Sequence, residues 1–395
     1  MRTEGDYIKI NEWLLPLSWF YGLGVGFRNW LFDLGVLKKR SFAIPIIAVG
    51  NITVGGSGKT PHVEYLIRLL KDVVKVGVLS RGYKRKSKGY VLADDETTAR
   101  EIGDEPYQMK QKFPDVYVAV DKNRCQGVDR LTHDKETHDV DVILLDDAYQ
   151  HRYIQPGINI LLVDYHRLII YDKLLPAGRL RESLNGKSRA DIVIITKCPK
   201  DLKPMEFRVL TKAMNLYPYQ ELYFTCIDYD APVAVFPKEA EPLADAQSPF
   251  CGKNVLLLTG IASPLQMEAD LKKQCRTITP LTFADHHFFK AKDAQRINEA
   301  FQSLPEPRLI ITTDKDSTRL ENLEGLDDDV RRHLYRLPIR IRFMLDEAET
   351  FNHKIISYVR KNSRNSILAK GKDDSKPADR HHSGNRSRTI SFRDN

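Results

Sequence analysis

Short apolar runs alternate with loops and helical patterns from residue 44 onward. Residues 44–49 form an apolar run, a glycine-rich loop follows, and residues 62–71 show the apolar spacing of a helix. The run at 140–146 does not alternate with polar residues, which is typical of a strand that is covered on both faces. Similar runs recur at 75–80, 116–120, 158–164 and 191–196. The alternation predicts an α/β fold, a parallel sheet with helices on both of its faces.

A second series of the same kind begins near residue 250. We expect strands at 254–259, 281–284, 308–313 and 339–343, with helices between them. The stretch 226–250 carries four prolines and is interpreted as the connection. The patterns divide the chain into four segments: an apolar, aromatic segment 1–40, a core domain 41–225, a second, smaller α/β domain 226–360, and a disordered basic tail 361–395.

The first forty residues are unusually apolar and contain all three tryptophans of the chain, ahead of the basic run 38–40. Pro16 and three glycines interrupt the run, and Arg28 and Asp33 keep it below the roughly 20 uninterrupted apolar residues that a spanning helix needs. The basic start and cleavage site of a signal peptide are not found. Two interpretations stay open: two short helices that lie in a membrane interface, or aromatic side chains that cover the core of the following domain.

Composition indicates a folded chain and says little about nucleic acid. With 395 residues, the chain exceeds what one core usually organises, and a mean hydropathy of −0.40 excludes a polytopic membrane protein. Residues 361–395 hold nine Lys or Arg against four Asp or Glu, which leaves only +3 of the net charge of +8 for the rest. This segment has few apolar groups and cannot bury enough surface to offset the entropy of ordering, so we expect it to be disordered. Because it carries most of the basic balance, we infer no nucleic-acid partner. Five dispersed cysteines without a C-x-x-C pair are typical of reduced thiols.

The strongest chemical signal is the glycine-rich segment 50–60, between a buried strand and a helix. In such a P-loop, backbone N–H groups and the helix N-terminus bind phosphate, the lysine reaches the β- and γ-phosphates, and the following hydroxyl ligates Mg²⁺. The usual pattern has glycine where this chain has Thr53, so an accidental Gly-Lys-Thr in a glycine-rich turn is the alternative. The residues expected to bind nucleotide are Thr53, Val54, Gly55, Gly56, Ser57, Gly58, Lys59 and Thr60.

A P-loop requires an acidic partner for the metal ion at the end of a neighbouring strand. Asp146 and Asp147 follow the apolar run 142–145 and have this form. Side chains of adjacent residues on an extended chain diverge, so one carboxylate can face the metal while the other holds a water, a lysine or a substrate hydroxyl. The alternative is an Asp pair that caps a turn.

Three further loops are expected at the same edge of the sheet. Arg81 directly follows the second strand, where it either reaches a phosphate or is solvated. Asp104 lies in Gly-Asp-Glu-Pro and is either a helix cap or a functional carboxylate. Arg179 and Arg181 follow a turn and suit an anionic substrate, although the signal is weak alone.

The second series supplies one candidate, the histidine pair His286 and His287 after its second strand. Adjacent histidines suggest a metal, but no third ligand stands at a suitable spacing. We therefore favour an acid/base or hydrogen-bonding role over zinc.

Six motifs, taken together and in this order, resemble the tetraacyldisaccharide 4'-kinases of lipid A synthesis. The resemblance extends from about residue 44 to residue 320, and the family shares the irregularity at Thr53. Ala148 and Tyr149 depart from the more usual family residues. The motifs occupy residues 50–61, 80–83, 103–106, 146–151, 175–182 and 283–287.

The resemblance implies ATP-dependent phosphorylation of the 4'-hydroxyl of a tetraacylated glucosamine disaccharide 1-phosphate, on a P-loop NTPase-like sheet. ATP and Mg²⁺ are the implied cofactors. The implied location is peripheral, on the cytoplasmic face of the inner membrane of a Gram-negative bacterium, with the acylated lipid and the membrane surface as partners and no protein partner inferred. The apolar segment 1–40 would then dock on the bilayer that holds the acyl chains.

The family's functional roles map onto matching positions of this sequence. Asp104 becomes the candidate base, since a carboxylate can accept the proton of a sugar hydroxyl as the phosphoryl group transfers. His286, from the second unit, would tune Asp104 only when the two units close. The implied residues are Lys59, Asp104, Asp147 and His286 for catalysis, Thr60, Asp146 and Asp147 for the metal, and Arg81, Arg181, Gln150 and His151 for the substrate.

Two other classes of protein share part of this pattern. A P-loop GTPase or metallochaperone would share Lys59, Thr60 and Asp146, and Thr196-Lys197 faintly resembles a guanine-reading motif. That motif requires an Asp two residues after the lysine, where this chain has Pro199. A non-catalytic, membrane-associated nucleotide-binding protein is the other class, and measured turnover separates it from a kinase.

Overall fold

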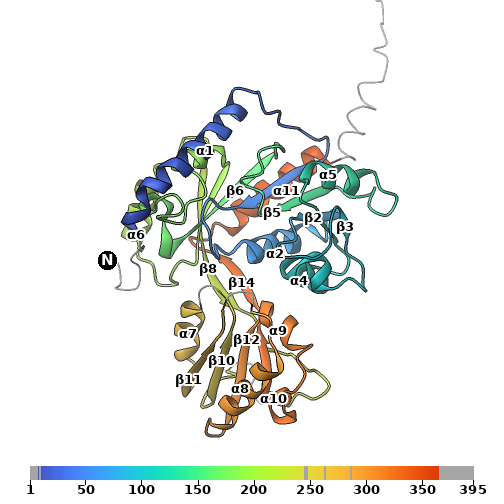
Figure 1. The fold of residues 1–395 in the computed structure, drawn as a ribbon, viewed down its shortest axis with the longest axis vertical. Helices are drawn as coiled ribbons and strands as arrows, with labels where there is room; N and C mark the ends of the chain where they lie inside the picture. The colour runs from blue at the N-terminus through green and yellow to red at the C-terminus, as the bar shows by residue number, and fades with distance from the viewer. Residues whose placement is uncertain (1–7, 9, 244–247, 262–263, 285–286, 364–395) are drawn as a thin grey trace, which may run out of the picture.

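The chain folds around two sheets that are joined by a narrow two-stranded connection (Figure 1). This computed structural model describes residues 8, 10–243, 248–261, 264–284 and 287–363. The predicted site residue His286, and the predicted tail 361–395 except for its first three residues, lie outside the described residues.

The larger sheet has nine strands in the order β14-β8-β7-β6-β1-β5-β2-β4-β3. Its seven central strands are parallel, while β3 and β14 pair antiparallel with their neighbours at the two edges. The strands are β1 Ile46–Gly50, β2 Val76–Ser80, β3 Val91–Leu92, β4 Tyr117–Val120, β5 Val142–Asp146, β6 Ile158–Asp164, β7 Ile192–Thr196, β8 Glu221–Tyr229 and β14 Ile339–Phe343.

Helices cover both faces of this sheet, as the sequence predicts. On one face, α2 (Lys59–Leu70), α4 (Asp104–Lys112) and α11 (Ala348–Asn362) bury their apolar side chains against β1, β2 and β5. On the other face, α5 (Arg124–His133) and α6 (Pro204–Met214) pack on separate apolar clusters. Parallel strands buried on both sides explain why their sequences are continuously apolar. The short helix α3 (Ala99–Ile102) precedes α4.

The smaller sheet has five strands in the order β11-β10-β12-β13-β9, of which only β9 is antiparallel. Its own apolar core lies between the sheet and helix α8. The predicted α/β fold with a second, smaller unit is therefore confirmed. The elements are β9 Val233–Ala234, β10 Asn254–Thr259, β11 Thr277–Thr282, β12 Arg308–Thr313, β13 Leu334–Leu337, α7 Leu265–Lys272, α8 Ala291–Gln302, α9 Asp314–Leu320 and α10 Asp328–His333.

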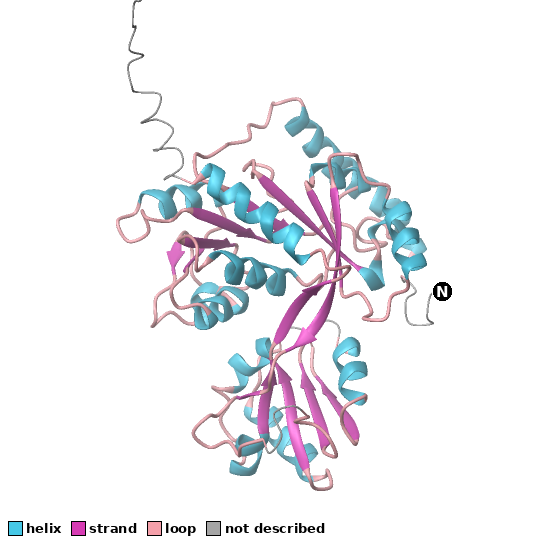
Figure 2. Ribbon diagram, turned by 180° about the vertical axis from the view of Figure 1, so that it is seen from behind, coloured by secondary structure: helices cyan, strands magenta, loops and turns pink. Residues whose placement is uncertain are grey.

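The prediction that the strand at 339–343 belongs to the second unit is wrong. This strand, β14, pairs antiparallel with β8 of the larger sheet, from Ile339 opposite Tyr229 to Phe343 opposite Thr225. Seen from behind, β8 and β14 form the connection between the two units (Figure 2). The chain then returns to the larger unit, where α11 buries Phe351 beside α2. An apolar pattern identifies a strand but not the sheet that it joins, which is why sequence alone misplaced it.

The amino-terminal segment forms one long helix, α1 (Leu15–Asp33), after a single 3₁₀ turn at Glu12–Leu14. The expectation of two short helices is therefore wrong. Pro16 lies in the first turn, where a missing N–H group costs no intrahelical hydrogen bond. The helix lies along the outside of the larger unit (Figure 1). Among the described residues, no helix combines the length and apolarity needed to cross a membrane.

Candidate active site

The glycine-rich loop connects the end of β1 to the start of α2 at Lys59. Gly58 caps α2 with a φ of +81°, a left-handed conformation that favours glycine. Inside the loop, the buried Asn51 Nδ2 donates hydrogen bonds to Ser57 Oγ at 2.8 Å and to Thr53 Oγ1 at 3.3 Å. The threonine that replaces the usual glycine thus takes part in the hydrogen bonding that shapes the loop.

A neighbouring segment braces the outer side of the loop. The backbone N–H of Val54 donates to Arg179 O at 2.8 Å, and the N–H of Arg181 donates to Ile52 O at 2.7 Å. Thr53 and Leu180 form an isolated antiparallel bridge between these two hydrogen bonds. The paired arginines predicted for an anionic substrate are therefore held against the P-loop by main-chain contacts.

The two aspartates follow β5, which runs parallel to β1 with Asp146 opposite Val49. Asp147 has a φ of +47°, so the chain turns sharply between the two residues and their side chains diverge. Lys59 Nζ lies 3.6 Å from Asp147 Oδ1. Arg181 Nη1 lies 3.5 Å from the same oxygen. Sheet register thus brings the P-loop lysine, the aspartate pair and Arg181 together.

The environment shifts the pKa values of the two carboxyl groups in opposite directions. Burial raises the pKa of Asp146 to about 7, with repulsion from Glu105 and Asp147 adding to this rise. Burial alone would also raise the pKa of Asp147, but the cations Lys59 and Arg181 lower it below its ordinary value. Neighbouring groups whose pKa values are pushed apart are a frequent feature of catalytic sites.

Six of the predicted residues meet in one pocket of about 430 Å³. One of its walls is helix α1, which contributes Tyr21, Arg28 and Asn29. Arg28 Nη2 donates to Gln150 O at 3.2 Å, and Arg181 Nη1 donates to Gln150 Oε1 at 3.2 Å. The predicted residues that line the pocket are Val54, Arg81, Asp146, Asp147, Gln150 and Arg181.

The segment with Asp104 packs against the segment with Arg81. Gly103 has a φ of +94°, and a Cβ atom there would lie 3.0 Å from Tyr83 O. This close approach of two backbones requires glycine and positions the start of α4 beside the pocket. Glu105 lines the pocket, whereas Asp104 does not. Asp104 Oδ2 instead contacts Arg319 Nη2 of the smaller unit.

The chain is similar to known proteins over most of its length. The LpxK family model, described as Tetraacyldisaccharide-1-P 4'-kinase, matches residues 10–360. The chain belongs to this family. It is 57% identical to the tetraacyldisaccharide 4'-kinase of Phocaeicola vulgatus, over 92% of this chain and 99% of the relative. It is 52% identical to the tetraacyldisaccharide 4'-kinase of Bacteroides thetaiotaomicron, over 93% of this chain and 98% of the relative.

A solved structure shows the same architecture. LpxK from Aquifex aeolicus, in complex with ATP, is similar with a TM-score of 0.64 and 28% identity, covering 88% of this chain and 99% of that chain. The resemblance to the tetraacyldisaccharide 4'-kinases is thus confirmed, and with it the P-loop kinase fold. The roles of individual residues remain predictions.

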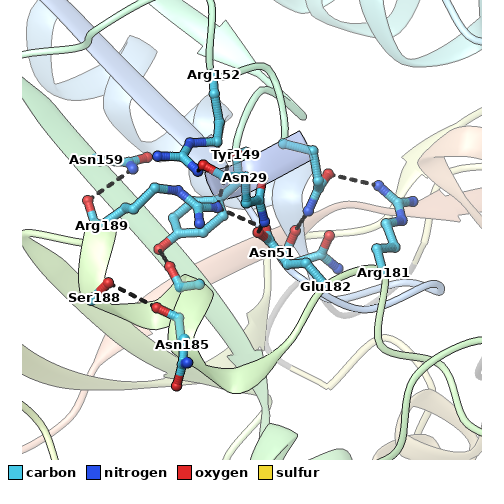
Figure 3. Close-up of polar contacts among 12 residues, drawn as sticks. Asn29, Asn51, Tyr149, Arg152, Asn159, Arg181, Glu182, Asn185, Ser188 and Arg189 are labelled. Atoms are coloured by element: carbon cyan, nitrogen blue, oxygen red, sulfur yellow. Dashed lines mark hydrogen bonds and ion pairs between the residues drawn. The ribbon is translucent and has the colours of Figure 1, made fainter. Parts of the chain in front are cut away.

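One predicted substrate residue of this kinase lies outside the pocket. His151 lines a separate cavity of about 440 Å³, together with Arg152 and Arg189. Burial lowers the pKa of His151 to about 4, assisted by nearby arginines, so the ring is neutral at pH 7. Figure 3 shows how Arg152 and Arg189 approach Asn29 and Tyr149 near this cavity.

Sequence reasoning missed several groups that the fold brings to the aspartate pair. Ser80 Oγ donates to Asp146 Oδ2 at 3.0 Å. Arg124 is buried at the start of α5, and burial lowers its pKa to about 10 while Asp146 and Asp147 oppose the shift. Ser80 ends β2 and Arg124 follows β4, two strands that end at the same edge of the sheet, and this position was the available signal. Glu105 was seen only as the neighbour of Asp104.

Proposed function

We propose that the pocket beside the P-loop is where this kinase transfers the γ-phosphoryl group of ATP to the 4'-hydroxyl of the acylated disaccharide. The observation that carries the proposal is that Asp147 contacts the P-loop lysine and lines the same pocket as helix α1. A nucleotide on the P-loop and a lipid headgroup under α1 would meet at this carboxylate. Lys59 would stabilise the charge that develops on the transferred group.

The proposed metal site comprises Asp146, Asp147 and the hydroxyl of Thr60. Asp146 Oδ1 is buried and has no hydrogen-bond partner within the described part of the chain. A buried carboxylate with a raised pKa is stabilised in its charged form by a cation, and carboxylate and hydroxyl oxygens are the ligands that Mg²⁺ prefers. When bound, Mg²⁺ would neutralise charge on the phosphates.

The proposed base is Asp104. As the first residue of α4, it follows the glycine that packs against the Arg81 segment. A sugar hydroxyl is a poor nucleophile at neutral pH, so a carboxylate within hydrogen-bond reach would accept its proton during transfer. The predicted partner of Asp104, His286, lies outside the described residues and keeps the role of a prediction.

The proposed membrane contact is the outer face of α1. Only Ser18 and Phe32 of this helix are buried, so its aromatic residues do not chiefly cover the core. Trp19, Phe20 and Trp30 are 64%, 65% and 54% exposed. Exposed tryptophans on a helix favour the membrane interface, which supports a peripheral location. We place this location on the cytoplasmic face of the inner membrane, as the family resemblance implies.

An apolar groove along α1 suits the acyl chains of the substrate. It has a volume of about 560 Å³ and is lined by residues such as Gly22, Gly26 and Leu174. Because other side chains of α1 line the catalytic pocket, one helix would hold the acyl chains on one side and the headgroup on the other.

The decisive experiment measures ATP turnover with and without the disaccharide lipid in detergent micelles. We expect turnover that depends on the lipid and a product with a new 4'-phosphate. Lipid-independent hydrolysis of GTP would favour the GTPase class, and nucleotide binding without turnover would favour a non-catalytic protein.

A further inference from the structure

Helix α9 of the smaller unit contacts α4 of the larger unit at both of its ends. Asp104, the first residue of α4, pairs with Arg319 near the end of α9. Lys112, the last residue of α4, pairs with Asp314 at the start of α9, with 2.7 Å between Nζ and Oδ2. The two helices therefore run in opposite directions and are joined by two ion pairs. Figure 1 shows α9 at the end of the smaller unit that faces α4.

Arg319 is fixed from behind by its own unit. Its side chain is only 6% exposed, and Nη1 lies 3.4 Å from Asp316 Oδ1. Asp316 is buried, and its Oδ2 accepts hydrogen bonds from the N–H of Gly260 at 2.8 Å and from Thr313 Oγ1 at 2.7 Å. A guanidinium held in this way presents Nη2, the atom that contacts Asp104, in a fixed direction.

The second ion pair has different surroundings. Lys112 Nζ also lies 3.0 Å from the buried carboxylate of Glu64 on α2, and Gln108 Nε2 donates to the same carboxylate at 2.8 Å. This cluster joins the same two helices but lies at the end of α4 remote from Asp104. Breaking this second ion pair therefore shows what the loss of a purely structural contact between the two helices does to activity, for comparison with the loss of Arg319.

We propose that Arg319 is a positioning residue for phosphoryl transfer, which orients the carboxylate of Asp104 and ties its position to the smaller unit. The inference rests on the proposed function, in which Asp104 accepts the proton of the sugar hydroxyl. Arg319 binds the Oδ2 atom, so this ion pair fixes the orientation of the carboxylate at the start of α4. A displacement of about 1 Å in such a group is sufficient to lower a rate by about 100-fold.

The test compares kcat and the KM for ATP in full-length variants with the disaccharide lipid in micelles. Arg319→Gln is expected to lower kcat by roughly 10- to 100-fold while the KM for ATP stays within about twofold, because the contacts found for Arg319 among the described residues are to α4 and to its own unit. Arg319→Lys keeps the charge without the planar fork and should recover part of the rate. The matched control, Asp314→Asn, breaks the other ion pair between the same helices and should leave kcat within about threefold.

A second comparison uses the Asp104→Asn background. If Arg319 acts through Asp104, adding Arg319→Gln to Asp104→Asn should lower kcat by less than about twofold more. Strict multiplication of the two effects, or equal kcat for Arg319→Gln and Asp314→Asn, would overturn the inference. If Arg319→Gln does not fold, Arg319→Lys decides, since it must lower kcat more than Asp314→Asn does.

Different results would refute the proposed function and the role of Arg319. Wild-type protein without lipid-dependent turnover, or an Asp104→Asn variant with normal kcat, would refute the proposed function. An impaired Asp104→Asn variant beside an unimpaired Arg319→Gln variant would refute only the role of Arg319.

Discussion

At the scale of single residues, the site keeps one of its two carboxylates in surroundings that disfavour its charged form. The carboxyl group of Asp146 is buried without a partner for one of its oxygens among the described residues. Lys59 and Arg181 offset the cost of burying the charge of Asp147 and lower its pKa. At Asp146 the cost of burial prevails, and the pKa is raised. Such local cost at a site is expected where a ligand completes the arrangement.

Removing the P-loop cation should abolish transfer without unfolding the protein. Lys59→Ala is expected to lower kcat by on the order of 10²- to 10³-fold or more, since charge stabilisation in the transition state is lost. Steady-state kinetics with a circular-dichroism melt measure both properties. Lys71→Ala, at the other end of the same helix, is the matched control and should leave kcat unchanged. A folded Lys59→Ala variant with near-normal kcat would remove the P-loop from the mechanism.

Neutralising Asp146 should stabilise the protein while it destroys activity. Folding raises the pKa of this carboxyl group from 3.8 to about 7. The free energy of unfolding therefore falls as the pH rises through this range, because the carboxyl group then ionises freely only in the unfolded state. The shift corresponds to about 4 kcal/mol at pH 8 at most. We expect Asp146→Asn to raise the free energy of unfolding in Mg²⁺-free buffer, more at pH 8 than at pH 5. Urea denaturation at both pH values measures this, and equal stability of the two proteins at pH 8 would contradict it.

His62 should give the stability a pH dependence of the opposite sign. Burial lowers its pKa to about 4, and its ring contacts Gly58 O at 2.7 Å and Thr225 Oγ1 at 3.1 Å. The unfolded state takes up a proton below about pH 6.5, so stability is lost as the pH falls from about 6.5 to 4, by about 3 kcal/mol.

The measurement compares unfolding of wild type and His62→Asn between pH 4 and pH 7. The Asn amide can replace the donor to Gly58 O but cannot titrate, so the variant should show the shallower pH dependence. His151, shifted in the same direction, is present in both proteins and cancels in the difference. Parallel curves would show that His62 does not carry the effect.

At the scale of elements, α1 combines two surfaces. Its inner face contributes Tyr21 and Asn29 to the pocket, and Asn29 Nδ2 donates to Glu182 Oε2 at 3.3 Å. Its outer face exposes aromatic side chains. The pattern of hydrophobic residues in the sequence cannot tell the inner face from the outer face, because aromatic residues suit both a core and a membrane interface.

Polar substitutions on the outer face should affect membrane binding more than chemistry. Trp19→Glu combined with Phe20→Glu is expected to weaken binding to anionic vesicles at least tenfold, since a loss of about 1.4 kcal/mol already has this effect. The kcat with a micellar substrate should stay within about threefold. Vesicle sedimentation and micellar kinetics measure the two effects. Leu265→Glu, on an exposed position of α7, is the control, and unchanged sedimentation of the double variant would assign the aromatics to another role.

At the scale of the whole molecule, the larger unit is completed by the end of the chain. Phe343 of β14 and Phe351, Ile355 and Val359 of α11 belong to the same apolar cluster as Val63 of α2. Sequence continuity groups these residues with the smaller unit, whereas packing places them in the larger one.

A fragment that ends at residue 225 should therefore fail to fold cooperatively. Losing one buried Phe typically costs about 3–5 kcal/mol, and this fragment loses two together with β14 and α11, against a total stability of about 5–15 kcal/mol. Circular-dichroism melts of 1–225 and, as the control, of 1–363 measure the difference. A cooperative transition in the short fragment would show that the larger unit does not need its carboxy-terminal elements.

The sequence by itself determined the α/β class, the P-loop and the family, because these depend on local patterns. A continuously apolar strand, a glycine-rich turn and Lys59-Thr60 at a helix start are readable over a dozen residues. Asp146 and Asp147 were found in the same way, since they directly follow such a strand.

Only the tertiary structure decided which distant groups meet. The pairing of Arg319 with Asp104 joins residues 215 positions apart, and the place of β14 depends on which sheet edge has open hydrogen bonds. The same holds for the wall that α1 provides and for the separation of His151 from Gln150. These contacts depend on the packing of whole elements, and a local pattern of apolar and polar residues does not encode the partner that each element will meet.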